Sequence, residues 1–153
     1  MQVLRGVVGL VLVAALLGIP VSAGASLVEA KKTTTVNVKL LEFKVKPKPS
    51  AVASGTVRFR VKNIGGEEHE FVVVKTDAAL PTASDGSVDE DAIPKADKFG
   101  EVEELKSKRS GTLTVKALPA GQYVLFCNIV DDESNGTKLS HYAEGMSTNF
   151  SVG

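Results

Sequence analysis

The chain has 153 residues, with 18 acidic and 18 basic side chains, so its formal net charge is zero. This length suits one domain plus a removable leader. The balanced charge provides no basic field of the kind that binds nucleic acid, and we expect no nucleic-acid partner. Because Cys127 is the only cysteine, an intrachain disulfide is excluded.

The first 25 residues have the features of a secretory signal peptide. Arg5 provides a positive start, residues 7–21 are apolar apart from glycines and a proline, and residues 22–25 are small enough for cleavage after Ala23 or Ala25. An apolar run of about 15 residues is short for a membrane-spanning helix, which needs roughly 20. The alternative is retention of this segment as an uncleaved N-terminal anchor.

Cleavage would leave residues 26–153 as the mature domain, in the periplasm or secreted and without further membrane association. In such an oxidising compartment cysteines usually pair. The single Cys127 is therefore expected to be an intermolecular bridge, a free thiol or a metal ligand.

Short strands dominate the predicted mature domain. Alternating apolar and polar residues, or short apolar runs, end at Gly, Pro and Asn. The segment between residues 77 and 100 carries prolines, glycines and many charges, and we predict an excursion between strands there. Seven or eight short strands without a sustained amphipathic helix predict an all-β fold, a Greek-key β-sandwich. The predicted strands are residues 36–45 (with one slip in register), 50–53, 56–62, 71–74, 101–105, 112–116, 122–127 and 148–152.

Four side chains of this domain can bind a soft or borderline metal ion: His69, Cys127, His141 and Met146. Two imidazoles and a thiolate with a weak axial thioether hold copper in both oxidation states, so one electron can pass with little rearrangement. Structural zinc usually needs more thiolates or a fourth strong ligand, which makes zinc the weaker alternative. The remaining alternative is four unconnected residues in a β protein, with Cys127 an inert buried thiol.

The order of these residues resembles a known family. Residues 123–129, followed by His141-Tyr142-x-x-Gly145-Met146, resemble the C-terminal signature of cupredoxins, the type 1 blue copper proteins. Residues 63–71 are similar to the segment that carries the first histidine of that family, and residues 118–121 to the turn before its cysteine strand. The resemblance covers most of residues 33–153 apart from the 77–100 excursion.

The resemblance implies a cupredoxin-like sandwich that binds one copper ion, cycling between Cu(I) and Cu(II). His69, Cys127 and His141 would be its equatorial ligands and Met146 its axial ligand. It also suggests that backbone N–H groups near Glu70 and Asn128 donate to the cysteine sulfur. Phe71, Phe126 and Ile129 are candidates for the apolar surroundings that tune the site.

One feature departs from the family. Its second histidine commonly follows the cysteine after a few residues, whereas thirteen residues, 128–140, intervene here. The simplest explanation is an insertion over roughly residues 130–140. If the ends of the insertion lie close together, it can protrude as a surface loop at modest entropic cost. If they do not, His141 would miss the metal.

The sequence therefore predicts an exported, monomeric electron-transfer protein with transient redox partners and no enzymatic activity. Electrons would leave through His141, because His69 adjoins the buried strand around Phe71. One alternative is a periplasmic copper carrier, storage or delivery protein that uses the same ligands. Another is a metal-free interaction domain in which Cys127 forms an intermolecular disulfide. Residues 131–136 resemble the start of a calcium loop, but Tyr142 stands where the bidentate glutamate belongs.

Overall fold

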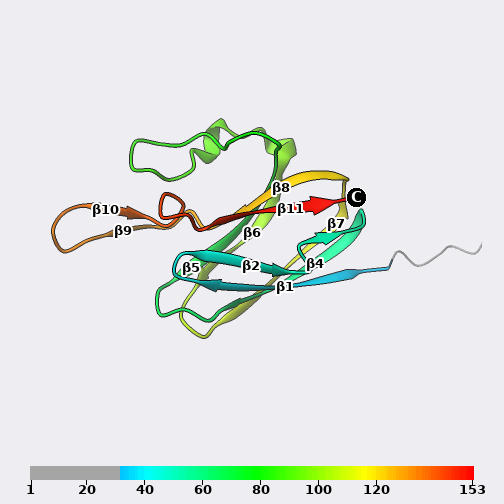
Figure 1. Cartoon of the computed structure of the whole chain (residues 1–153), viewed down its shortest axis with the longest axis horizontal. Coiled ribbons are helices and arrows are strands. Elements are labelled where there is room, and N and C mark those ends of the chain that lie inside the picture. The colour runs from blue at the N-terminus through cyan, green and yellow to red at the C-terminus, as the bar shows by residue number, and fades with distance from the viewer. Residues whose placement is uncertain (1–31) are drawn as a thin grey trace, which may run out of the picture.

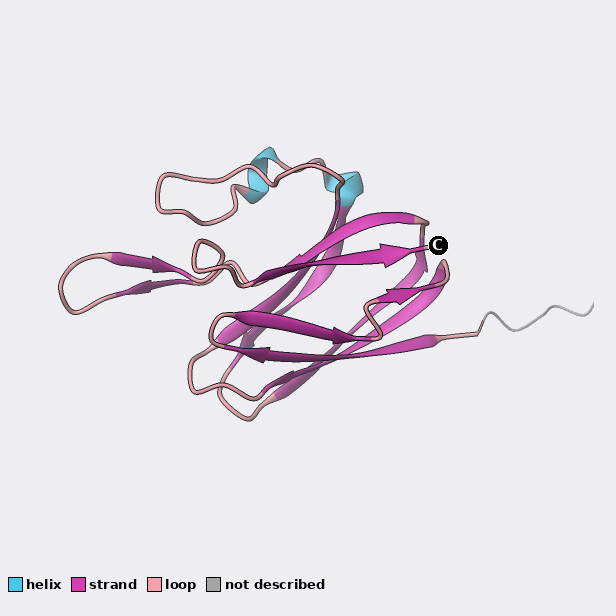
Figure 2. Ribbon diagram, in the orientation of Figure 1, coloured by secondary structure: helices cyan, strands magenta, loops and turns pink. Residues whose placement is uncertain are grey.

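The computed structural model describes residues 32–153. These residues form two packed β-sheets, with one hairpin projecting from an end of the sandwich (Figures 1 and 2). The predicted signal peptide, residues 1–25, lies outside the described residues. Within residues 32–153, none of the helices has the length and apolar character that crossing a membrane requires.

The described residues contain eleven strands. The four-stranded sheet has the order β2-β1-β4-β7, and the five-stranded sheet has the order β3-β11-β8-β5-β6. The two remaining strands, β9 and β10, form the projecting hairpin. The bounds are β1 Thr34–Leu41, β2 Lys44–Lys48, β3 Ala51–Val52, β4 Gly55–Asn63, β5 His69–Lys75, β6 Lys98–Leu105, β7 Ser110–Leu118, β8 Gly121–Phe126, β9 Val130–Asp132, β10 Lys138–Ser140 and β11 Ser147–Val152.

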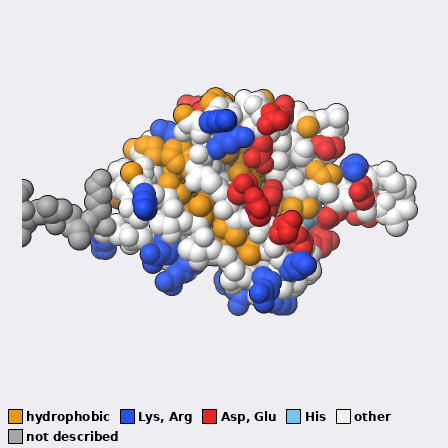
Figure 3. Space-filling view, turned by 180° about the vertical axis from the view of Figure 1, so that it is seen from behind, with side chains coloured by type: hydrophobic (Ala, Val, Ile, Leu, Met, Phe, Trp, Pro, Cys, Tyr) orange, Lys and Arg blue, Asp and Glu red, His pale blue; other side chains and the backbone are white. Residues whose placement is uncertain are grey.

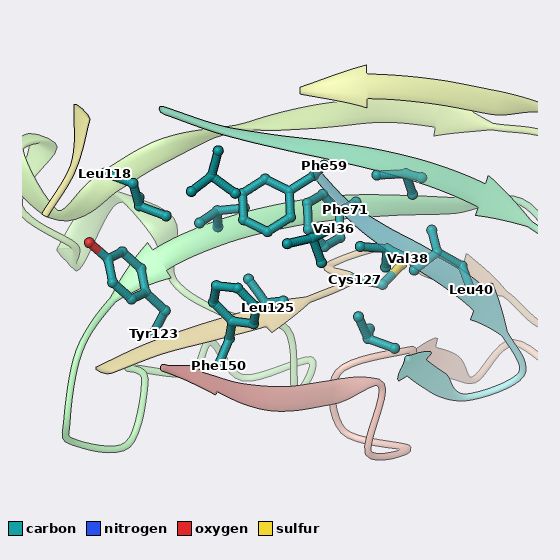
Figure 4. Close-up of a cluster of buried hydrophobic side chains, with 14 of the residues drawn as sticks. Val36, Val38, Leu40, Phe59, Phe71, Leu118, Tyr123, Leu125, Cys127 and Phe150 are labelled. Atoms are coloured by element: carbon teal, nitrogen blue, oxygen red, sulfur yellow. The ribbon is translucent and has the colours of Figure 1, made fainter. Parts of the chain in front are cut away.

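The core lies between the two sheets and follows from the alternation in the sequence. In β1 and β4 every second residue is buried, because successive side chains of a strand point to opposite faces. Figure 4 shows side chains of both sheets meeting in this layer. Fully burying one such side chain stabilises the fold by about 1.5–3 kcal/mol. The largest fully buried apolar side chains are Tyr123, Phe59, Phe71, Phe126, Phe150, Leu40, Leu118, Leu125 and Met146. The predicted β-sandwich is confirmed.

The first predicted strand is in fact a hairpin. The chain turns back at Glu42 and Phe43, and β2 pairs antiparallel with β1 so that Val45 lies opposite Leu40. The single strand with a slipped register over residues 36–45 was therefore a wrong prediction. Pro47 is accommodated because β2 is an edge strand, where a missing N–H donor breaks no interior ladder.

The excursion between β5 and β6 covers the outer face of the five-stranded sheet. It contains two single-turn 3₁₀ helices, η1 (Glu90–Ala92) and η2 (Lys95–Asp97). Its apolar side chains, Leu80, Val88 and Ile93, pack against Val72, Val74 and Phe126 of that sheet. Burial on both faces explains why β5 is a continuous apolar run instead of an alternating one.

Candidate metal site

Two paired strands position the first two predicted ligands. His69 is the first residue of β5, and Cys127 directly follows β8, which pairs antiparallel with β5. The backbone N–H of Glu70 donates to the Cys127 sulfur at 3.3 Å. In Figure 4, Cys127 and Tyr123 lie toward opposite ends of the buried layer, so the site lies at one end of the sandwich.

A short loop brings in the other two predicted ligands. The N–H of Met146 donates to the carbonyl of His141 at 2.9 Å, and the N–H of Cys127 donates to the carbonyl of Met146 at 3.1 Å. Gly145 has a φ of +90°, a conformation that glycine adopts without strain, and its N–H donates to the Tyr142 carbonyl. The backbone of the 141–146 turn is thus bonded directly to the cysteine.

The insertion after the cysteine is a hairpin with closed ends. Strands β9 and β10 pair antiparallel, with Val130 opposite Ser140, and the N–H of His141 donates to the carbonyl of Ile129 at 2.9 Å. Figure 1 shows the hairpin projecting beyond the sandwich. The insertion therefore returns the chain to the site instead of carrying His141 away from it.

Three of the four predicted side chains converge. Nδ1 of His69 lies 3.3 Å from Nδ1 of His141, which lies 3.4 Å from the sulfur of Cys127. All three donor atoms lie within 4.8 Å of one another, and all three residues are fully buried. Ligand bonds of about 2.0–2.3 Å at trigonal angles separate donor atoms by about 3.5 Å. This spacing suits a single ion, and it argues against four unconnected residues.

Met146 is buried in the same core cluster as Cys127. Its backbone is hydrogen-bonded to both His141 and Cys127, which places the residue beside the three converging side chains. Its role as the axial ligand stays a prediction.

Burial shifts the protonation equilibria of two of the converging groups. Burial raises the pKa of the Cys127 thiol to about 12, although the backbone N–H groups of Glu70 and Ile129 oppose this shift. Burial also lowers the pKa of His69, which keeps the imidazole in the neutral form that binds metals. A thiol in this place becomes a thiolate when a cation replaces its proton. The donor set therefore fits a thiophilic metal such as copper.

Carboxylates lie near the Nε2 atom of each imidazole, on the side of the ring away from the other predicted ligands. Nε2 of His141 lies 2.9 Å from Oδ2 of Asp131 and 3.7 Å from Oε2 of Glu67. Nε2 of His69 lies 3.5 Å from Oε1 of Glu42 and has no hydrogen-bond partner. A carboxylate behind a ligating histidine orients the ring and raises its basicity as a ligand.

Glu42 is itself held in place. Its Oε1 accepts from the backbone N–H groups of Gly66 and Glu67, and the Glu67 bond makes the largest contribution to lowering the Glu42 pKa. Sequence reasoning missed these roles of Glu42 and Asp131. Asp131 belongs to an acidic run that resembles the start of a calcium loop and is more simply a solvated loop beside the site, and no local pattern connects either residue with a histidine.

The backbone N–H groups that donate to the sulfur are those of Glu70 and Ile129, the residue after Asn128, as the resemblance suggested. The N–H of Asn128 itself donates to Oε1 of Glu70, at 2.7 Å. Both imidazole rings have a relative exposure of 0%, so burial does not distinguish His141 from His69 as the route for electrons. Phe43 covers His141 from one side, with a ring-centroid distance of 4.9 Å.

The deep burial of Cys127 also bears on the disulfide alternative. A bond to a second chain would require the sulfur to leave the core. The structure therefore argues against an intermolecular disulfide.

Comparison with known proteins identifies the family. Residues 9–138 match the family model of the cupredoxin-like domain. The chain belongs to the cupredoxin-like family. The predicted resemblance is thus confirmed, whereas His141 and Met146 lie beyond the matched residues. A comparison with curated proteins finds no match to this chain.

Solved structures of similar fold include two auracyanins and a rusticyanin. Auracyanin from Roseiflexus castenholzii is 22% identical, covering 78% of this chain and 97% of its own, with a TM-score of 0.55. Auracyanin A from Chloroflexus aurantiacus, described as a "blue" copper protein, is 17% identical over 80% and 100% of the two chains, with a TM-score of 0.52. Rusticyanin from Thiobacillus ferrooxidans is 20% identical over 81% and 79%, with a TM-score of 0.54. At these identities the likeness shows the fold.

Proposed function

We propose that this cupredoxin-like protein binds one type 1 copper ion and acts as an electron-transfer shuttle. His69, Cys127 and His141 are the equatorial ligands, and Met146 is the axial one. The observation that carries the proposal is the convergence of two imidazole nitrogens and one thiol sulfur from three fully buried residues. The description of auracyanin A as a "blue" copper protein supports it.

The protein's part in this function is to hold the ligands still. His69 and Cys127 sit on paired strands, and hydrogen bonds tie the loop with His141 and Met146 to the cysteine. Copper bound there supplies a one-electron couple, and a rigid site limits the rearrangement between its two states. Full burial excludes water from the donor atoms. These features suit repeated electron exchange.

Electron exit is proposed to occur at the carboxylate-lined end. The rings of both histidines are buried, but the side chains behind them reach solvent: Asp131 is 45% exposed, Glu67 46% and Glu42 33%. A redox partner with a basic contact surface would complement this end. Such docking is expected to be weak and brief, with a small interface.

We also propose that the protein is exported and works as a monomer in the periplasm or outside the cell. The support is the signal-like composition of residues 1–25, and residues 26–153 would then form the mature copper domain. Intact-mass measurement of the protein recovered from cells checks this. A mature chain beginning after Ala23 or Ala25 is the expected result, whereas an uncut chain would favour the anchor.

The decisive experiment is addition of Cu(II) to the purified protein, followed by visible and EPR spectroscopy. An intense thiolate-to-copper charge-transfer band is expected, with one copper bound per chain. Repeated cycles of reduction and oxidation then distinguish the shuttle from the copper carrier. A shuttle retains its copper in the presence of a Cu(I) chelator, whereas a carrier surrenders Cu(I) to it.

A further inference from the structure

The two sheets differ sharply in charge. The strands of the four-stranded sheet contain eight basic residues and no acidic residue, namely Lys39, Lys44, Lys46, Lys48, Arg58, Arg60, Lys62 and Lys116. The strands of the five-stranded sheet contain four glutamates and two lysines. Figure 3 shows, on one side of the molecule, that acidic and basic side chains gather in different places. A formal net charge of zero therefore conceals a strongly dipolar protein.

The basic residues share the outer face of their sheet. In β1 and β4 the alternate positions are buried in the core, so Lys39, Arg60 and Lys62 point away from it and are exposed. Strand pairing places Lys46, Lys39 and Lys62 side by side in one row across three strands. The next row along contains Lys48, Asn37 and Arg60. We call these outward-facing residues, together with the other basic residues of the sheet, the basic face.

Nothing within the described residues neutralises the basic face. None of the ion pairs in residues 32–153 involves any of its eight cations. Like charges directly opposite each other on neighbouring strands destabilise a sheet. The rows of opposed cations therefore cost some folding stability instead of contributing to it. An anionic partner would remove this cost.

The basic face has a hollow between β1, β4 and β7. Its lining surface is mostly apolar, and the polar and charged residues around it include Lys39, Arg60, Lys62, Ser110 and Thr112. Ammonium, guanidinium and hydroxyl groups together can neutralise a phosphodiester and donate hydrogen bonds to its oxygens.

The composition of the basic face favours a lipid surface over a protein. Protein interfaces are enriched in aromatic residues and depleted in lysine, and their binding energy concentrates in buried aromatic or arginine anchors. The basic face has six lysines, two arginines and no aromatic residue, so lysine predominates. Among the described residues, the one exposed large hydrophobic side chain is Ile64, which lies beyond the end of β4. Diffuse attraction of lysines to anionic headgroups needs no such anchor.

We propose that the basic face docks on an anionic phospholipid bilayer. Docking there leaves the end of the sandwich with His69, Cys127 and His141 free, because that end is built from loops and strand termini. The protein would then move in two dimensions along a membrane and still present its carboxylate-lined end to a redox partner. This inference depends on the charge of the sheet and holds whether or not copper is bound.

Sedimentation with lipid vesicles tests the proposal. The full chain is mixed with vesicles of phosphatidylcholine alone, or of phosphatidylcholine with about 30% phosphatidylglycerol, a content chosen to give a clearly negative surface potential. Because the apolar residues 7–21 can bind either vesicle, the measured quantity is the gain in binding caused by the anionic lipid. That gain is expected to fall steeply with added salt.

Two quadruple variants with the same loss of charge make the test specific. Lys39→Gln, Lys46→Gln, Lys48→Gln and Lys62→Gln together remove half of the basic face. Lys75→Gln, Lys95→Gln, Lys98→Gln and Lys138→Gln remove four lysines elsewhere.

Each Lys or Arg near an anionic bilayer strengthens binding about fivefold. In the first variant, the gain in vesicle binding caused by the anionic lipid is therefore expected to fall at least about tenfold. The second variant is expected to retain most of this gain. Equal losses in the two variants, or no anionic gain in the parent chain, would overturn the proposal. If the parent chain instead binds polyglutamate through the same four lysines and shows no anionic lipid gain, an acidic protein is the partner and the membrane is excluded.

Discussion

The two halves of the proposed ligand set are held in different ways. His69 and Cys127 lie at the ends of β5 and β8, whose pairing in the core leaves them little freedom. His141 and Met146 lie on a six-residue turn that follows the projecting hairpin and is bonded to the core by backbone hydrogen bonds. On this proposal the core strands define where a metal ion would bind, while the hairpin and the turn adjust its surroundings. We therefore expect changes to the strand-held ligands to abolish copper binding, and changes to the hairpin and the turn to alter it gradually.

The largest expected effect is that of Cys127→Ser. Replacing the strand-held thiolate by a hydroxyl removes the soft ligand that copper prefers. The thiolate charge-transfer band should disappear entirely from the visible spectrum of the copper-treated protein. A Cys127→Ser protein as strongly coloured as the parent would refute the assignment of the site.

The next largest effect is expected from the core around β5 and β8, the strands that position His69 and Cys127. Leu125 of β8 has a relative exposure of 0%. Leu125→Ala should lower the free energy of unfolding by about 2–5 kcal/mol, since it leaves a cavity in the layer between the sheets. Urea denaturation of the metal-free protein measures this effect.

The matched control is Leu139→Ala, because Leu139 is a half-buried residue of β10 in the hairpin. It should cost less than about 1 kcal/mol, since little apolar surface leaves the core. If the two leucine variants lost the same free energy of unfolding, the hairpin would belong to the cooperative core. The distinction between the strand-held and the hairpin-held parts of the site would then fail.

Asp131→Asn tests the contribution of the hairpin to the site. The carboxylate 2.9 Å from Nε2 of His141 should orient the ring and increase its donor strength. Its replacement by an amide is expected to weaken copper binding about 10-fold to 100-fold and to raise the reduction potential. A chelator titration and a redox titration measure the two effects.

Asp132→Asn is the control for that variant. Asp132 lies on the same strand but is exposed and pairs with Lys138. The copper affinity and the reduction potential of this variant should both equal those of the parent protein. If the Asp131 variant also matched the parent protein, the carboxylate would have no influence on the copper.

The smallest effect is expected for Met146→Leu. A thioether in the axial position binds weakly and at long range, so its loss leaves the equatorial set intact. The charge-transfer band should persist at a shifted wavelength. Complete loss of the band would mean that Met146 holds the turn or the metal more firmly than an axial ligand does.

The sequence was a good guide wherever local pattern decides structure. The alternation in residues 56–62 predicted β4, and the apolar run before Cys127 predicted β8. It failed at Glu42 and Phe43, where the alternation changes phase. A slip within one strand and a two-residue turn leave the same pattern in the sequence, and only the pairing of β2 with β1 distinguishes them.

The excursion between β5 and β6 shows the same limit. Its prolines and charges indicated irregular structure, but no pattern within the segment itself indicated which face it covers. Leu80, Val88 and Ile93 form no periodic stripe, because irregular segments bury side chains wherever their path meets the sheet. The continuous apolar character of β5 was a sign that something covers its outer face.

By itself the sequence determined the β-sandwich, its core positions and the four side chains able to bind copper, because alternation and residue chemistry are properties of the chain at each point. Tertiary structure alone decided that Asp131 and Glu42 stand behind the imidazoles, that His141 is as buried as His69, and that one sheet collects the basic residues on its outer face. These features depend on distances between segments far apart in the chain, and such distances arise only when the two sheets, the hairpin and the loops are packed together.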